Sequence, residues 1–171
     1  MYLEPNRLLA VLFALAFMVA GCTEPTDFTL PASEEITRYY ESGTVLEAEV
    51  RGNVAVVTVQ QSAAQIRRGG SLWAKVGPYI YLFTEETFEL LQDFPGLGGV
   101  RVKTQTAGGS EIASVILPRE ELTGVLWRRS LNIAGRVRLN GTEQITLIED
   151  LIEWGEGHTD FDYNPRYVQR R

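Results

Sequence analysis

The chain has 171 residues, a formal net charge of −6 and an ordinary globular composition, which suits one folded domain plus processed segments. The acidic balance excludes nucleic acid as a partner, because binding phosphates requires a basic stripe that displaces counterions. With one cysteine, Cys22, and one histidine, His158, the sequence offers no internal disulfide and no zinc spacing, so we expect no metal and no cofactor.

The first residues have the organisation of an export signal. Arg7 supplies a positive charge, and an unbroken apolar run follows from Leu8 to Ala20. A membrane-spanning helix needs about 20 apolar residues, and this run is shorter. Its length is typical of the apolar region of a signal peptide.

The apolar run ends in Val19, Ala20, Gly21 and Cys22. This segment resembles the lipobox of bacterial lipoprotein precursors, and the resemblance covers residues 1–22 only. It implies that residues 1–21 are removed and that lipid on the Cys22 thiol holds the protein on a membrane. Two or more acyl chains anchor a protein stably, since each buried methylene contributes about 0.8 kcal/mol. Thr23 favours the periplasmic face of an outer membrane, if the cell has one, over the inner membrane.

The mature chain divides into three parts. Residues 22–32 contain two prolines and no apolar period, so we expect a lipidated tether. We expect residues 33–154 to form a single β-rich domain. Residues 155–171 are polar and aromatic without a period, which predicts a flexible C-terminal tail.

The domain starts with a short helix capped by Ser33 and ended by Gly43. Strands 44–51 and 54–60 then flank Gly52 and Asn53, which predicts a hairpin with a type II′ turn. The expected register places Val50 opposite Ala55, Ala48 opposite Val57 and Leu46 opposite Val59, so that one face is wholly apolar.

Later segments predict further hairpins. We expect a loop at 61–70, strands 71–76 and 79–83 around Gly77-Pro78, a helix from Glu85 capped by Thr84 and stopped by Pro95-Gly96, a hairpin of 100–106 with 111–117, and a hairpin of 133–139 with 142–148 around Asn140-Gly141. In the last hairpin we favour a bulge that aligns Val137 with Ile145. Segment 119–129 is compatible with a helix or a strand.

The sum is about eight short strands and two or three short helices, without parallel βαβ units. The fold class we predict is therefore mainly β, a β-rich α+β domain. Its antiparallel hairpins would form a small, partly closed barrel or a sandwich.

Candidate catalytic groups have structural explanations. The adjacent pairs Glu34-Glu35, Glu85-Glu86 and Glu120-Glu121 each lie at an expected helix N-terminus, where negative charge is stabilising. His158 lies in a glycine-flanked stretch, whereas a catalytic residue needs rigid placement. Asp160, Asp162 and Asn164 have the spacing of a calcium loop, but Pro165 and Arg171 replace the required glycine and glutamate. A looser calcium site on the tail remains an alternative.

Five residues are candidates for ligand or partner contacts: Trp73, Trp127, Trp154, Arg136 and Arg138. The tryptophans can stack on sugars or partners, or can fill the core. Arg136 and Arg138 would point the same way from one strand, toward lipid headgroups or other anions. The alternative is a solvated face with Arg138 opposite Glu143.

These observations predict a membrane-anchored envelope lipoprotein with a non-enzymatic, protein-binding or assembly role. Its partners would be the membrane, through the lipid on Cys22, and an envelope protein. The alternative is a glycan- or lipid-binding module of the envelope. A third class, a hydrolase, would require two carboxylates distant in sequence to converge in a cleft.

Overall fold

A computed structural model describes residues 28–40, 45–141 and 143–169, apart from the side chains of Gln65 and Arg68. In chain order the elements are α2 (Ser33–Tyr39), β1 (Val45–Arg51), β2 (Val54–Gln60), α3 (Ala63–Leu82), α4 (Glu85–Asp93), β3 (Gly99–Gln105), β4 (Glu111–Pro118), α5 (Gly124–Asn140), α6 (Ile145–Glu156), β5 (Asp160–Tyr163) and α7 (Pro165–Val168). The predicted signal segment and the predicted lipidation site, Cys22, lie outside the described residues. The predicted bounds of the first helix are wrong, because its N-cap is Ala32, in place of Ser33, and it ends at Tyr39, before Gly43.

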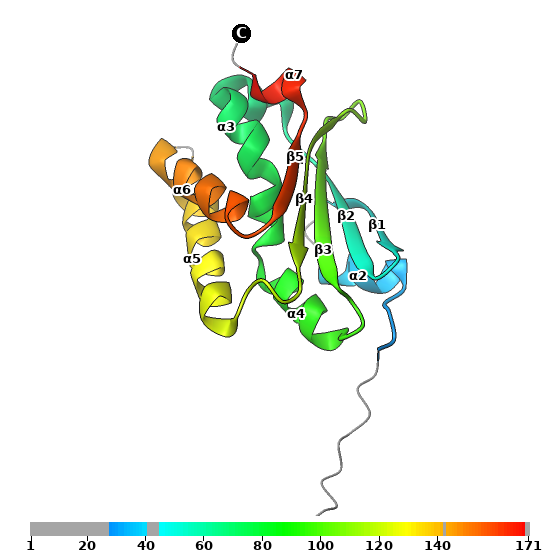
Figure 1. The fold of residues 1–171 in the computed structure, drawn as a ribbon. Coiled ribbons are helices and arrows are strands. Elements are labelled where there is room, and N and C mark those ends of the chain that lie inside the picture. The colour runs from blue at the N-terminus through cyan, green and yellow to red at the C-terminus, as the bar shows by residue number, and fades with distance from the viewer. Residues whose placement is uncertain (1–27, 41–44, 142, 170–171) are drawn as a thin grey trace, which may run out of the picture.

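The five strands form one sheet in the order β1-β2-β3-β4-β5 (Figure 1). β2 and β3 run parallel, and the other neighbouring pairs run antiparallel. Long α3 packs on β3 and β4, and α6 packs on both α3 and α5. The helices thus cover one face of the sheet, and the other face carries polar side chains that we describe below.

Strand periodicity decides which face is covered. Val57, Val102 and Val115 are cross-strand neighbours, and all three are completely buried under the helices. Tyr79 and Leu151 are equally buried on the helix side of this core. Burying such apolar side chains contributes about 1.5–3 kcal/mol each, so the sheet–helix interface is the main source of stability.

The predicted mainly β fold with a partly closed barrel or sandwich is wrong: the structure is α+β, with an open, mixed sheet. Residues 71–76 and 79–82, which we predicted as strands, belong to α3. Val76 and Tyr79 of this helix and its C-cap residue, Phe83, are buried at helical spacing. Pro78 lies inside this helix and does not form a turn. The strands β2 and β3 run parallel, and the helices α3 and α4 connect them. The prediction that the fold contains no parallel βαβ unit is therefore also wrong.

The predicted hairpin around Asn140 and Gly141 is replaced by two helices. Trp127, Ser130, Ala134 and Val137 are buried at spacings of three and four residues, which is the period of α5. Gly141 ends that helix with a right-handed backbone, and its N–H donates to the Val137 carbonyl at 2.8 Å. The bulge aligning Val137 with Ile145 and the pairing of Arg138 with Glu143 are therefore wrong.

The segment predicted as a flexible tail contains β5 and α7. β5 pairs with β4, and the Tyr163 hydroxyl lies 2.7 Å from the Tyr79 hydroxyl of α3. The Asn164 N–H donates to the Ile112 carbonyl at 2.9 Å. This segment completes the sheet, and its aperiodic sequence reflects a strand of only four residues.

Two hairpins and one helix cap are confirmed. The β1–β2 register pairs Val50 with Ala55 and Ala48 with Val57, and β3 pairs with β4. Gly52 has a φ of +64°, as the first position of a type II′ turn requires. An irregularity near the start of β1 pairs Val45, in place of Leu46, with Val59. Thr84 caps α4 by accepting from the Thr87 N–H.

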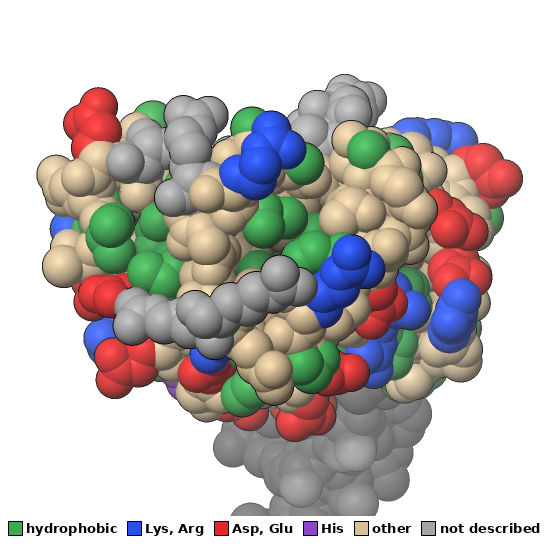
Figure 2. Space-filling model, turned by 90° about the horizontal axis from the view of Figure 1, so that it is seen from above, with side chains coloured by type: hydrophobic (Ala, Val, Ile, Leu, Met, Phe, Trp, Pro, Cys, Tyr) green, Lys and Arg blue, Asp and Glu red, His purple; other side chains and the backbone are tan. Residues whose placement is uncertain are grey.

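A small second cluster closes the end of the molecule that carries α7. Ile66 and Tyr167 pack there against buried Ala74 and Ile112. Seen from this end, hydrophobic side chains reach the surface between charged groups of both signs (Figure 2). The described chain begins at the opposite end of the molecule, with the segment that leads into α2 (Figure 1). Within the described residues, none of the helices combines the length and hydropathy needed to cross a bilayer.

Candidate functional site

Helices α5 and α6 enclose a groove of about 620 Å³. Its α5 side is one stripe of side chains at helical spacing, and its other side comes from α6 and the residues that follow it. The lining residues are Arg129, Asn132, Ile133, Arg136, Leu147, Asp150, Glu153, Trp154, Gly157 and His158. The volume lies within the range of small-molecule and peptide-anchor sites.

Trp154 is half-buried in this groove, and Ser130 and Arg129 contact its ring. The indole Nε1 donates to Ser130 Oγ at 2.8 Å, and that hydroxyl donates to the Leu126 carbonyl at 2.9 Å. The Arg129 guanidinium lies over the ring, 4.3 Å from its centroid. A tryptophan with its N–H satisfied and a cation on its face is a rigid feature of the surface.

His158 lies at the end of the groove, where it contacts residues before α5 and within α6. Its Nδ1 lies 3.0 Å from Glu121 Oε1, in the turn before α5. Its ring centroid lies 4.2 Å from that of Trp154. We had expected Glu121 in the first turn of a helix, but it precedes the start of α5 by three residues. The pair joins the end of α6 to the start of α5.

Charges of both signs line the groove without internal partners. Arg136 comes from α5, and Asp150 and Glu153 come from α6. The three side chains are exposed and make no hydrogen bond or ion pair with any residue that the structure describes. They are therefore available to a binding partner.

Comparisons with known proteins give no family for this chain. No family model, curated protein or solved structure matches it. The groove must therefore be interpreted from its own chemistry.

The predicted contact residues separate into three environments. Trp154 and Arg136 share the α5–α6 groove. Trp73 and Arg138 line a second, smaller cavity between α3 and α5. Trp127 is 5 % exposed and packs in the core, with its ring 5.2 Å from that of Phe88. The prediction that Arg136 and Arg138 point the same way is wrong, because two residues apart on a helix face nearly opposite directions.

Sequence reasoning placed Arg129 in a basic stretch with Arg128, Arg136 and Arg138, but it missed Asp150, Glu153 and Gln61. Arg129 precedes Arg136 by seven residues, Asp150 precedes Trp154 by four, and Glu153 follows Asp150 by three, so predicting helices over 124–140 and 145–156 would have grouped them. No local sequence pattern identifies Gln61, because it lines the smaller cavity only as a result of α3 packing beside it.

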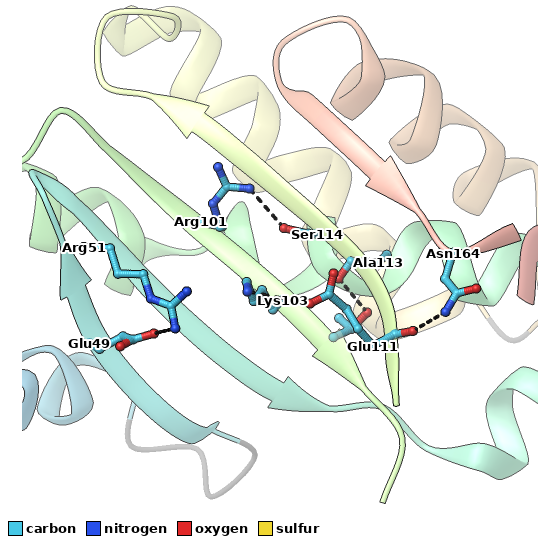
Figure 3. Close-up of polar contacts among 9 residues, drawn as sticks. Glu49, Arg51, Arg101, Lys103, Glu111, Ala113, Ser114 and Asn164 are labelled. Atoms are coloured by element: carbon cyan, nitrogen blue, oxygen red, sulfur yellow. Dashed lines mark hydrogen bonds and ion pairs between the residues drawn. The ribbon is translucent and has the colours of Figure 1, made fainter. Parts of the chain in front are cut away.

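The open face of the sheet has a hollow of about 410 Å³, but its cations have partners (Figure 3). Arg51 pairs with Glu49, and Lys103 Nζ lies 3.6 Å from Glu111 Oε2. Arg101 Nη1 donates to Ser114 Oγ at 3.2 Å. Exposed pairs of this kind help to fix strand register and contribute little to stability. We therefore do not assign a site to this face.

A tyrosine pair joins β5 to the helical layer. Burial raises the pKa of Tyr79 to about 12, although its hydrogen bond to Tyr163 acts in the opposite direction. Burial is also the main reason that the pKa of Tyr163 is raised. Raised pKa values disfavour the phenolate, so this pair does not form a base at neutral pH. Its role is structural.

The acidic side chains form no cation site within the described ranges. No group of three or more His, Cys, Asp or Glu side chains there is placed to hold a metal ion. Asp160 and Asp162, considered above for calcium, lie on β5. Glu34 and Glu35 lie in the first turn of α2, and Glu85 and Glu86 in that of α4, as we predicted.

Proposed function

We propose that this protein is a lipid-anchored, non-enzymatic binding protein of the bacterial cell envelope, which engages a protein partner through the α5–α6 groove. Export and anchoring rest on the signal-like residues 1–21 and on Cys22. The binding role rests on one observation: Arg136, Asp150 and Glu153, which have no partner in the described part of the chain, surround a tryptophan whose N–H is hydrogen-bonded.

The composition of the groove favours a protein partner over a glycan. Tryptophan and arginine are enriched among the residues that contribute most to protein–protein binding. A glycan site requires an accessible aromatic face, whereas Arg129 lies over the Trp154 ring and Trp127 is buried. Unpaired charges of both signs also favour a partner with complementary charges.

The anchor is tested by the intact mass of the protein isolated from its native host. We expect a mature chain that begins at Cys22 and carries acyl groups on that residue. An intact Met1, or an unmodified sulfur at position 22, would remove the basis for the envelope assignment.

The partner is tested by affinity capture of the full-length, tagged protein from detergent extracts of the same host. Arg136→Glu reverses an unpaired groove charge, and we expect it to lower capture of the enriched partner at least about tenfold. Arg128→Glu is the matched control, because Arg128 is exposed on the same helix and does not line the groove. Equal capture by the two variants would exclude the groove as the binding site.

A further inference from the structure

The two helices that enclose the groove carry opposite charges. α5 contains four arginines and no acidic residue, whereas α6 contains four acidic residues and no basic residue. Of these, Arg129 and Arg136 line the α5 wall of the groove, and Asp150 and Glu153 line its α6 wall. The charges of the groove are therefore segregated by sign, one sign on each wall.

The two walls do not neutralise each other. α5 and α6 pack together (Figure 1), but no ion pair joins them in the described part of the chain. The four charged side chains that line the groove are all exposed. Opposite charges that face one groove and stay unpaired are suited to an occupant that offers an anion to α5 and a cation to α6.

Apolar side chains lie between the charged walls. Leu147 is buried, and Ile133 and Trp154 are half-buried in the groove. The Trp154 N–H is already satisfied by Ser130 Oγ at 2.8 Å, so an occupant needs no acceptor at the indole nitrogen. The groove therefore matches an occupant with three rows of side chains: an apolar row between an acidic row and a basic row.

An amphipathic helix presents three such rows on one face. Its apolar ridge recurs every three and four residues, and the positions on either side of that ridge carry the charges that select a partner in helical assemblies. A strand turns only every second side chain toward one face, so it would offer a single row. The groove volume of about 620 Å³ accommodates the side chains of a ridge, and helices pack on one another by placing ridges into grooves.

We infer, on the basis of the proposed function, that the α5–α6 groove binds an amphipathic helix of its protein partner that has one acidic flank and one basic flank. The acidic flank pairs with Arg129 and Arg136 of α5. The basic flank pairs with Asp150 and Glu153 of α6, and the apolar ridge packs on the floor between them. The proposed function thereby gains the secondary structure and the charge pattern of the bound segment.

The test uses two stapled peptides as probes of the full-length protein in detergent. Both have about 14 residues, with leucine along one ridge and glutamate and lysine in the flanks, and the staple keeps a peptide of this length helical. The segregated peptide has glutamate in one flank and lysine in the other, whereas the mixed peptide has both residues in each flank. The two share their composition, net charge and apolar ridge, so they partition equally into detergent. We expect fluorescence anisotropy to show at least about tenfold tighter binding of the segregated peptide.

Variants of the protein assign this preference to the walls of the groove. Arg136→Glu should weaken binding of the segregated peptide about tenfold, while Arg128→Glu, the same change outside the groove, should not alter it. Combining Arg136→Glu with Asp150→Arg gives each wall both signs, so the preference should reverse in favour of the mixed peptide. A reversed preference cannot arise from a loss of folding.

Equal binding of the two peptides by the unaltered protein overturns the inference, and so does an equal effect of Arg136→Glu and Arg128→Glu on the segregated peptide. A second copy of this chain as the occupant would appear in sedimentation as dimers that Arg136→Glu dissociates, and would also overturn the inference. The proposed function has a separate criterion, because it fails when the same two variants capture the host partner equally.

Discussion

The open face of the sheet and the α5–α6 groove both carry charged side chains around a hollow, but they use those charges differently. On the sheet, Arg51 and Lys103 have carboxylate partners, and Arg101 donates to a hydroxyl on the next strand. In the groove, Arg136 and Asp150 have no partner within the described structure. Paired charges complete a fold, whereas unpaired charges beside a fixed aromatic ring are available for recognition.

The largest expected effect comes from removing the ring that organises the groove. Trp154→Ala should lower the free energy of unfolding by about 3 kcal/mol, because the half-buried ring packs on the core and its N–H bonds Ser130. Chemical denaturation measures this change. Trp154→Phe retains most of the packing and should cost only about 1 kcal/mol. Equal losses in the two variants would show that the indole N–H has the dominant role.

The second prediction concerns the tyrosine contact beneath α6. The Tyr79 pKa is raised from 10.0 to about 12, so the folded state favours the neutral phenol. Its stability contribution is therefore complete below pH 10 and is lost as the pH rises toward 12. The loss should be about 2–3 kcal/mol, because each pKa unit corresponds to about 1.4 kcal/mol.

Tyr79→Phe provides the control for this pH dependence. It should reduce the fall in unfolding free energy between pH 10 and pH 12, measured by denaturant titration at each pH. In this variant the phenylalanine ring would remain packed against Gly155 of α6, where a Cβ would collide with the ring. An unchanged pH profile in this variant would contradict the structural role of the pair.

A smaller effect is expected for the ion pairs of the open face. Lys103→Ala, Glu111→Ala and the double variant form a thermodynamic cycle. Their coupling energy should be below about 1 kcal/mol, because Nζ and Oε2 are 3.6 Å apart and both side chains reach solvent. A coupling energy well above this value would mean that the open face contributes more to stability than its exposed charges indicate.

The smallest expected stability change is at Arg136. Arg136→Ala should alter the free energy of unfolding by less than about 0.5 kcal/mol, because the side chain is exposed and has no partner in the described chain. The same variant should nevertheless weaken partner capture. A large loss of stability would mean that Arg136 is structural, and would remove the contrast with the sheet.

Two hairpins of the sheet could be predicted from the sequence. The parallel pairing of β2 with β3, the strand β5 and the helical layer could not. Gly52-Asn53 and the alternation of β3 define hairpins locally, so their registers follow from short-range rules. In α3 and α5, Gly77-Pro78 and Asn140-Gly141 have turn-like sequences, although Pro78 lies inside a helix and Gly141 ends one. Each of these helices is determined by burial of residues at helical spacing, among them Tyr79 in α3 and Val137 in α5, which outweighs the local turn preference.

For the candidate site, too, single residues could be predicted from the sequence, but their arrangement in space could not. Trp154 and Arg136 were identified by residue type. Their proximity depends on α5 and α6, which we did not predict because Asn140-Gly141 has the sequence of a hairpin turn. Trp73 and Arg138 were identified in the same way, while Gln61 depends on the packing of α3 beside β2. Residue chemistry was visible in the sequence, and the grouping of those residues required the fold.

The most direct test of the account is site-specific photocrosslinking in the native host. A photoreactive phenylalanine at Asn132 lies in the groove, and one at Arg128 lies outside it on the same helix. The account predicts that position 132 gives a discrete crosslinked species containing one envelope protein, and that position 128 does not. Crosslinking that is absent at 132, or equal at both positions, would contradict a groove that binds a protein partner.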